Sequence, residues 1–205
     1  MLRLWGRTSS INVRKVLWCL QELGEPFERI EAGGPFGRVN DADYLARNPN
    51  AMVPLLEDGD FCLWESNVIV RYLCARAGSA LYPTDLQARF DAERWMDWQQ
   101  TTLNPAGRDA FLQWIRTPEG QRQPQLIAES VARTEPLLDL LDQQLQRQPF
   151  LAGEALSMAD LPVACEIHRW FGLPQPRREW PALERWYAGL RQRSAAEGVL
   201  DLPLT

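Results

Sequence analysis

The order of predicted elements constrains this chain of 205 residues more than any other feature. Strand and helix patterns alternate over residues 1–79, and no convincing strand pattern follows. Residues 2–5 alternate apolar and polar side chains, as a half-buried strand does, and residues 10–24 repeat apolar side chains at helical spacing. Residues 26–30 give a second strand pattern. Strand, helix and strand in this order predict two parallel strands joined by a helical crossover.

A hairpin and a further helix complete this first region. The apolar runs 53–57 and 61–64 flank Asp58-Gly59, which is a strong signal for a turn between antiparallel strands. Residues 66–77 then repeat apolar side chains at helical spacing, and Gly78 closes the helix. Together with the parallel pair, the hairpin predicts a mixed, four-stranded sheet.

The rest of the chain shows helical patterns alone. Residues 80–86 contain Pro83 and predict a linker. We therefore expect a first domain over residues 1–79, a linker over 80–86 and an all-helical domain over 87–205, an α+β organisation. The helical patterns of the second domain cover residues 89–111, 125–148, 157–171 and 181–193, and Pro136 is expected to kink the second of them.

The composition is that of an ordinary globular chain, with 45% hydrophobic and 24% charged residues. A net charge of −5 and scattered arginines give no basic footprint for nucleic acid. No run of about 18 apolar residues predicts a membrane span. Because the first residues also lack a signal-peptide pattern, we expect a cytoplasmic protein with no membrane partner.

Cysteine and histidine usage argues against a metal site. The four cysteines form no CxxC pattern. Three of them lie in apolar helical or strand stretches, which predicts buried, reduced thiols. The one histidine, His168, is interpreted as structural. We therefore expect no metal ion.

Hydroxyl and amide side chains gather where the first predicted strand meets the first predicted helix. Ser9, Ser10 and Asn12 lie beside the N-terminus of that helix, where unpaired backbone N–H groups and the helix dipole favour an anion. A thiolate held there would have a lowered pKa. The alternative interpretation is that Ser10 only caps the helix.

Two other features lie at element ends in the same domain. Pro54 opens a strand, and a cis bond after Val53 would turn the Val53 backbone toward an extended ligand, although trans is the default for such bonds. Ser66 begins a helix and suits a carboxylate, while the adjacent Glu65 suits an ammonium group. Together these two residues fit an amino-acid head group, and ligands of open α/β sheets bind near such ends. A plain helix cap beside a surface glutamate is the alternative.

The chain resembles the glutathione transferase superfamily over nearly its whole length. The loop Asn48-Pro-Asn-Ala-Met-Val-Pro54 resembles the family's Asn-Pro-x-x-x-Val-Pro pattern. Glu65-Ser-Asn-Val-Ile-Val-Arg-Tyr-Leu73 resembles its Glu-Ser-x-x-Ile-x-x-Tyr-Leu helix start. In the helical domain, Ser157-Met-Ala-Asp160 is similar to the family's Ser/Thr-x-x-Asp box, in which Ser157 caps a helix and Asp160 accepts from the Ser157 N–H.

This resemblance implies a thioredoxin-like first domain, a helical domain that contributes to the site for a second substrate, and a homodimer. It implies glutathione as co-substrate, with a cis bond between Val53 and Pro54. The backbone of Met52 and Val53 would pair with the cysteinyl part of glutathione, and Glu65 and Ser66 would hold its γ-glutamyl group. A serine of the first loop would favour the thiolate, which then attacks a small electrophile.

Several alternatives stay open. Ser10 is the first choice for the residue that activates the thiol, because Ser10-Ile-Asn-Val-Arg14 resembles the theta-like transferases. The pair Ser9-Ser10 also resembles the maleylacetoacetate isomerases, and Asn12 stands where a proline or small residue is common. A glutathione-dependent isomerase is therefore one alternative function. A non-enzymatic interaction module with the same fold is another, since fold alone does not fix function.

Overall fold

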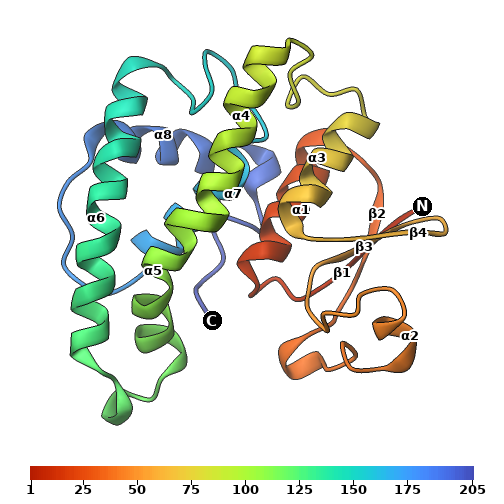
Figure 1. The fold of residues 1–205 in the computed structure, drawn as a ribbon, viewed down its shortest axis with the longest axis horizontal. Helices are drawn as coiled ribbons and strands as arrows, with labels where there is room; N and C mark the ends of the chain where they lie inside the picture. Colours follow the sequence, from red (N-terminus) through yellow and green to blue (C-terminus); the bar gives the residue numbers. More distant parts are fainter. The chain divides into compact units, whose positions relative to one another are not determined.

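A computed structural model describes all of residues 1–205. The chain divides into two compact units, Met1–Tyr82 and Pro83–Thr205. In Figure 1 the first unit contains the sheet, and the second is built from helices.

The first unit is a mixed sheet with helices, as the sequence predicts. Its strands lie in the order β2-β1-β3-β4. Strand β1 pairs parallel with β2 and antiparallel with β3, and β3 pairs antiparallel with β4. Gly59 adopts a φ of 61° in the hairpin turn, a conformation that glycine tolerates best. The elements are β1 (Leu2–Trp5), α1 (Ile11–Leu23), β2 (Phe27–Ile30), α2 (Ala42–Leu45), β3 (Leu55–Asp58), β4 (Phe61–Trp64) and α3 (Ser66–Arg76).

Helices α1 and α3 pack against each other (Figure 1), and a cysteine of each lies at their contact. The Sγ atoms of Cys19 and Cys74 lie 3.6 Å apart, and both residues are buried free thiols. The hydrogen bond with Cys74 and burial raise the pKa of the Cys19 thiol well above its ordinary value. Cys165 is buried and free as well, which confirms the prediction of reduced, buried thiols.

The second unit contains no named strand. The predicted helix 89–111 corresponds to α4 and α5 joined by the π-helical segment Gln99–Leu103. Helix α6 continues through Pro136 to Arg147. No helix of the protein combines the length and the apolar composition that crossing a membrane requires. The helices are α4 (Leu86–Trp98), α5 (Asn104–Phe111), α6 (Pro124–Arg147), α7 (Asp160–Phe171) and α8 (Pro181–Arg191), with a second π-helical segment at Leu112–Arg116.

A buried carboxylate joins the start of α7 to its surroundings. Asp160 accepts hydrogen bonds from the backbone N–H of Ser157 at 2.9 Å and of Leu151 at 3.0 Å. It also accepts from the Ser157 hydroxyl at 3.3 Å and from Trp186 Nε1 at 3.0 Å. The Ser157 hydroxyl accepts from the Ala159 N–H at 3.3 Å, so the predicted box forms, although α7 begins at Asp160 and not at Ser157. Burial raises the pKa of the Asp160 carboxyl to about 6, against the opposing effect of these donors.

We expect Asp160→Asn to destabilise the protein at pH 7 by about 1–3 kcal/mol, because its amide group turns a donor toward donors that are already in place. Since the folded-state pKa of Asp160 is raised, the wild type gains stability from this group as the pH falls from about 7 to about 4, by up to about 1.4 kcal/mol per pH unit. The variant lacks this gain.

Urea unfolding of the wild type and Asp160→Asn at several pH values measures this difference. The stability gap between them should widen toward pH 4. Ser157→Ala keeps the backbone donors and should cost less than Asp160→Asn. A gap that stays constant from pH 7 to pH 4 contradicts the raised pKa of Asp160.

Candidate functional site in the first unit

A cavity of about 160 Å³ lies where α1, the loop before β3 and the start of α3 meet. The predicted site residues Met52, Val53, Pro54, Glu65 and Ser66 all line it. Of the three candidate residues in the first loop, Ser9, Ser10 and Asn12, only Asn12 lines the cavity. The lining residues are Asn12, Asn48, Asn50, Met52, Val53, Pro54, Trp64, Glu65 and Ser66.

The loop before β3 is held at the carbonyl of Met52. Tyr44 Oη donates to this oxygen at 2.6 Å, and Asn48 Nδ2 donates to it at 2.8 Å. Asn48 Oδ1 in turn accepts from the backbone N–H of Asn50 at 3.1 Å. Asn48 is only 2% exposed, so its amide is both buried and bonded at each end. The next peptide bond, Val53–Pro54, is cis, as the family resemblance implies.

Aromatic and ionic contacts surround the Tyr44 ring on the side of β1. Its ring meets Trp5 edge-on at 6.0 Å between centroids, and the Arg47 guanidinium lies 4.7 Å from the centroid of the Trp5 ring. Arg47 also pairs with the buried carboxylate of Glu57. Val53 packs against the small core around Tyr44. Burial raises the pKa of the Tyr44 hydroxyl to about 12, so it stays protonated and can donate to Met52.

Glu65 and Ser66 meet at the N-terminus of α3. Glu65 has a φ of 75°, which is uncommon for a residue with a side chain, and such strain concentrates at ligand sites. Its side chain makes no capping bond to the helix. The Ser66 hydroxyl is buried and donates to Asn12 Oδ1 at 3.3 Å. The starts of α1 and α3 are therefore joined by a direct side-chain contact.

Ser10 occupies the N-cap position of α1 with extended backbone, but its side chain makes no capping hydrogen bond. The interpretation that its hydroxyl caps the helix is therefore wrong. The loop is ordered instead by Arg14, whose Nε donates to the Thr8 carbonyl at 2.7 Å. Neither Ser9 nor Ser10 lines the cavity, whereas Asn12 in the first turn of α1 does.

The chemistry of the lining suits a polar, extended ligand. Glu65 is its single charged side chain, and three asparagines supply amide donors and acceptors. The first N–H groups of α3 have no acceptor within their own helix and favour a carboxylate. The structure contains no group of three or more His, Cys, Asp or Glu side chains arranged to hold a metal ion.

Sequence reasoning missed several supporting residues. Asn48 belongs to the quoted loop pattern, yet its position alone does not reveal that its amide bonds the Met52 carbonyl. Tyr44, which no sequence pattern singled out, reaches the same carbonyl from α2. Asn50 and Trp64 line the cavity without having been predicted. The sequence signal that could have pointed to Asn48 and Asn50 is the asparagine-rich stretch directly before Val53-Pro54.

Comparison with known proteins shows the family to which the chain is similar. Residues 1–75 match the family model of the glutathione S-transferase N-terminal domain, and residues 124–189 match that of the C-terminal domain. Glutathione S-transferase GstB of Escherichia coli is 41% identical over 100% of both chains. A probable glutathione S-transferase of rice, Oryza sativa subsp. japonica, is 27% identical over 98% of this chain and 96% of its own.

A solved structure is also similar. The theta class glutathione S-transferase of Xanthomonas axonopodis pv. citri with glutathione bound has a TM-score of 0.96 and 44% identity, covering 100% of this chain and 99% of that one. The chain therefore belongs to the glutathione S-transferase family of enzymes. Its first unit is the thioredoxin-like domain of that family, and its second unit is the helical domain.

We expect Asn48→Ala to lower the free energy of unfolding by about 1–3 kcal/mol, because it leaves the Asn50 donors without their buried acceptor and removes one of the two bonds to Met52. Denaturant unfolding measures the loss. Asn50→Ala, at an exposed position of the same loop, is the matched control and should cost much less. Equal losses in the two variants would contradict the role of Asn48.

Proposed function

We propose that this protein binds glutathione in the cavity of the first unit, stabilises its thiolate and transfers it to a small electrophile. The observation that carries the proposal is the convergence of Glu65, Ser66, Val53 and Asn12 on one cavity. These residues come from three separate segments of the chain: the first turn of α1, the loop before β3 and the start of α3. Glutathione needs partners for an amino-acid head group, a peptide backbone and a thiol, and the lining offers a group for each.

The head group of glutathione carries an ammonium and a carboxylate. Glu65 is the one charged residue of the lining, so it receives the ammonium by a charge-assisted hydrogen bond. The carboxylate is received by the backbone N–H groups at the start of α3, including that of Ser66, because the Ser66 hydroxyl donates to Asn12. Because Tyr44 and Asn48 already occupy the Met52 carbonyl, Val53 supplies the backbone groups that pair with the cysteinyl part.

Three side chains are candidates for stabilising the thiolate: Ser10, Ser9 and Asn12. Lowering a thiol pKa from about 8.5–9 to about 7 takes roughly 2 kcal/mol, which one donor and a helix N-terminus can supply. Asn12 lines the cavity and the serines do not, which favours Asn12 over our first sequence-based choice, Ser10. With its oxygen accepting from Ser66, the Asn12 amide keeps its N–H donors for a thiolate.

The pKa of the bound thiol tests this proposal. We expect ultraviolet difference titration of the glutathione complex to give a thiol pKa below that of free glutathione. Asn12→Ala should return this pKa toward the free value, and Asn12→Asp should raise it further because it adds a like charge. Ser10→Ala and Ser9→Ala should leave it unchanged.

The other outcomes are equally clear. If Ser10→Ala alone restores the free pKa, Ser10 is the activating residue and the assignment to Asn12 is wrong. If Ser9→Ala alone restores the free pKa, the resemblance to the maleylacetoacetate isomerases gains support. Glutathione bound with an unshifted thiol, or not bound at all, rejects thiolate activation in this cavity.

Glu65→Gln tests head-group binding. We expect it to raise KM for glutathione about tenfold to a hundredfold, the loss of one charge-assisted bond, with a smaller change in kcat. Steady-state kinetics with a general electrophile such as 1-chloro-2,4-dinitrobenzene measures both constants. Asp60→Asn, which removes an exposed carboxylate outside the cavity, is the matched control and should match the wild type. An unchanged KM in Glu65→Gln would remove Glu65 from the site.

The finer features of this function rest on family resemblance. We propose a cytoplasmic homodimer with a role in detoxification, in which residues 87–205 form the domain that contributes contacts to the electrophile. The isomerase alternative drew its support from Ser9-Ser10, and neither serine lines the cavity. An interaction module without catalysis would not need the Glu65-Ser66 head-group pair, so the transferase activity remains the proposal.

A further inference from the structure

A pair of free thiols lies between the two helices whose first turns line the proposed glutathione site. Cys19 of α1 and Cys74 of α3 are fully buried, and their Sγ atoms lie 3.6 Å apart, in van der Waals contact. The Cys19 Sγ atom also lies 3.9 Å from the carbonyl oxygen of Val70, one turn before Cys74 on α3. The proposed transfer of glutathione uses neither sulfur atom, so that chemistry does not account for the pair.

The surroundings keep the two thiols unreactive while α1 and α3 are packed together. The hydrogen bond with Cys74 and burial raise the pKa of the Cys19 thiol well above its ordinary value, and a protonated thiol is a poor nucleophile. Neither cysteine is exposed to solvent. An oxidant therefore reaches the pair only when the two helices part locally, and the rate of oxidation follows that opening.

The same two helices meet a second time, at the cavity. Asn12 and Ser66 line the cavity, and their side chains are joined by a hydrogen bond of 3.3 Å. From Asn12 to Cys19 along α1, and from Ser66 to Cys74 along α3, the distance is about two helical turns, or about 10–12 Å. The thiol pair and the cavity are therefore two points of one contact between α1 and α3. Because packed helices move as rigid elements, a change in their separation at one point alters the other.

We propose that Cys19 and Cys74 form a redox-sensitive pair, which a hydroperoxide oxidises to a disulfide that joins α1 to α3 and weakens glutathione binding. Only the effect on glutathione rests on the proposed function. The disulfide draws the two sulfur atoms closer than van der Waals contact, so it changes the separation of the helices at which Asn12 meets Ser66.

The oxidation takes place in two steps. One thiol loses its proton and attacks the peroxide oxygen, which gives a sulfenic acid and releases an alcohol, or water where the oxidant is hydrogen peroxide. The other thiol then attacks the sulfenic sulfur, the S–S bond forms and water leaves. Two electrons pass from the two sulfur atoms to the O–O bond, and no further reductant or oxidant is needed.

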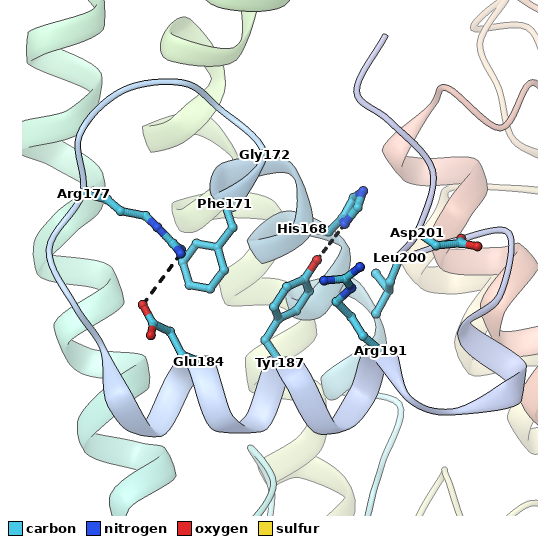
Figure 2. Close-up of a pocket in the computed structure, with 9 residues that line it drawn as sticks. All are labelled: His168, Phe171, Gly172, Arg177, Glu184, Tyr187, Arg191, Leu200 and Asp201. Atoms are coloured by element: carbon cyan, nitrogen blue, oxygen red, sulfur yellow. Dashed lines mark hydrogen bonds and ion pairs between the residues drawn. The ribbon is translucent and has the colours of Figure 1, made fainter.

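The other two cysteines of the chain provide matched controls. Cys62 of β4 is partly exposed, and the structure places no second thiol against it. Cys165 of α7 is buried, and it is the one cysteine of the second unit. The cavity of about 400 Å³ at the end of α7, which Figure 2 shows, is lined by no cysteine either. Neither Cys62 nor Cys165 can therefore replace a member of the pair.

The test treats the folded full chain with hydrogen peroxide and maps its disulfides by mass spectrometry of non-reduced peptides. We expect a crosslink between Cys19 and Cys74 in the wild type, in Cys62→Ser and in Cys165→Ala, and none in Cys74→Ala or Cys19→Ala. Isothermal titration calorimetry then compares the reduced and oxidised forms, with S-methylglutathione as the probe because it has no free thiol that could reduce the disulfide. The oxidised wild type should bind it about tenfold more weakly than the reduced form, and dithiothreitol should restore the affinity.

Three results would overturn the proposal. They are absence of the crosslink in the folded wild type, a crosslink that leaves the affinity for S-methylglutathione unchanged, and an equal loss of affinity in peroxide-treated Cys74→Ala. A reduced wild type that does not bind S-methylglutathione rejects the glutathione site, and with it the effect of the disulfide on binding. The peptide map uses no ligand, so it decides on the disulfide itself whatever the outcome for glutathione.

Discussion

The two hydrogen bonds on the Met52 carbonyl are the contact on which the rest of the candidate site depends. Tyr44 lies in the short helix α2 and Asn48 in the turn that follows it, and both donors converge on this one oxygen. The loop reaches β3 through Val53 and Pro54 directly after that carbonyl. Its position is therefore set by buried groups that touch no ligand, which is how a site gains the rigidity that binding requires.

A second contact links the parts of the site that would serve different pieces of the ligand. Ser66 begins α3 and Asn12 lies in the first turn of α1, and their side chains meet at 3.3 Å. Both helices direct their N-termini, and thus their positive dipole ends, toward neighbouring points of the cavity. The carboxylate of a head group and a thiolate are both anions, so one arrangement of helix ends stabilises each of them. Head-group recognition and thiol activation are in this way physically joined.

Much of the first unit could be predicted from sequence, because each element has a local signal. The hairpin followed from Asp58-Gly59 between apolar runs, and the mixed sheet followed from the strand order. Asn12 could not be preferred over Ser10, because that choice depends on which side chain faces a cavity built from distant segments. The φ of Glu65 and the π-helical segments are likewise products of packing, which periodicity does not report.

The cavity of the first unit must hold anions against the chain's own charge. A net charge of −5 makes the distant field of the protein unfavourable to a carboxylate or a thiolate. Attraction therefore has to come from groups at contact distance, namely the helix N-termini and amide donors that line this cavity. Contacts of this kind act over a few ångströms and depend on geometry, whereas a basic surface acts over a Debye length and attracts any anion. The sequence thus combines a repulsive exterior with local donors, so that an anion must fit a cavity in order to bind.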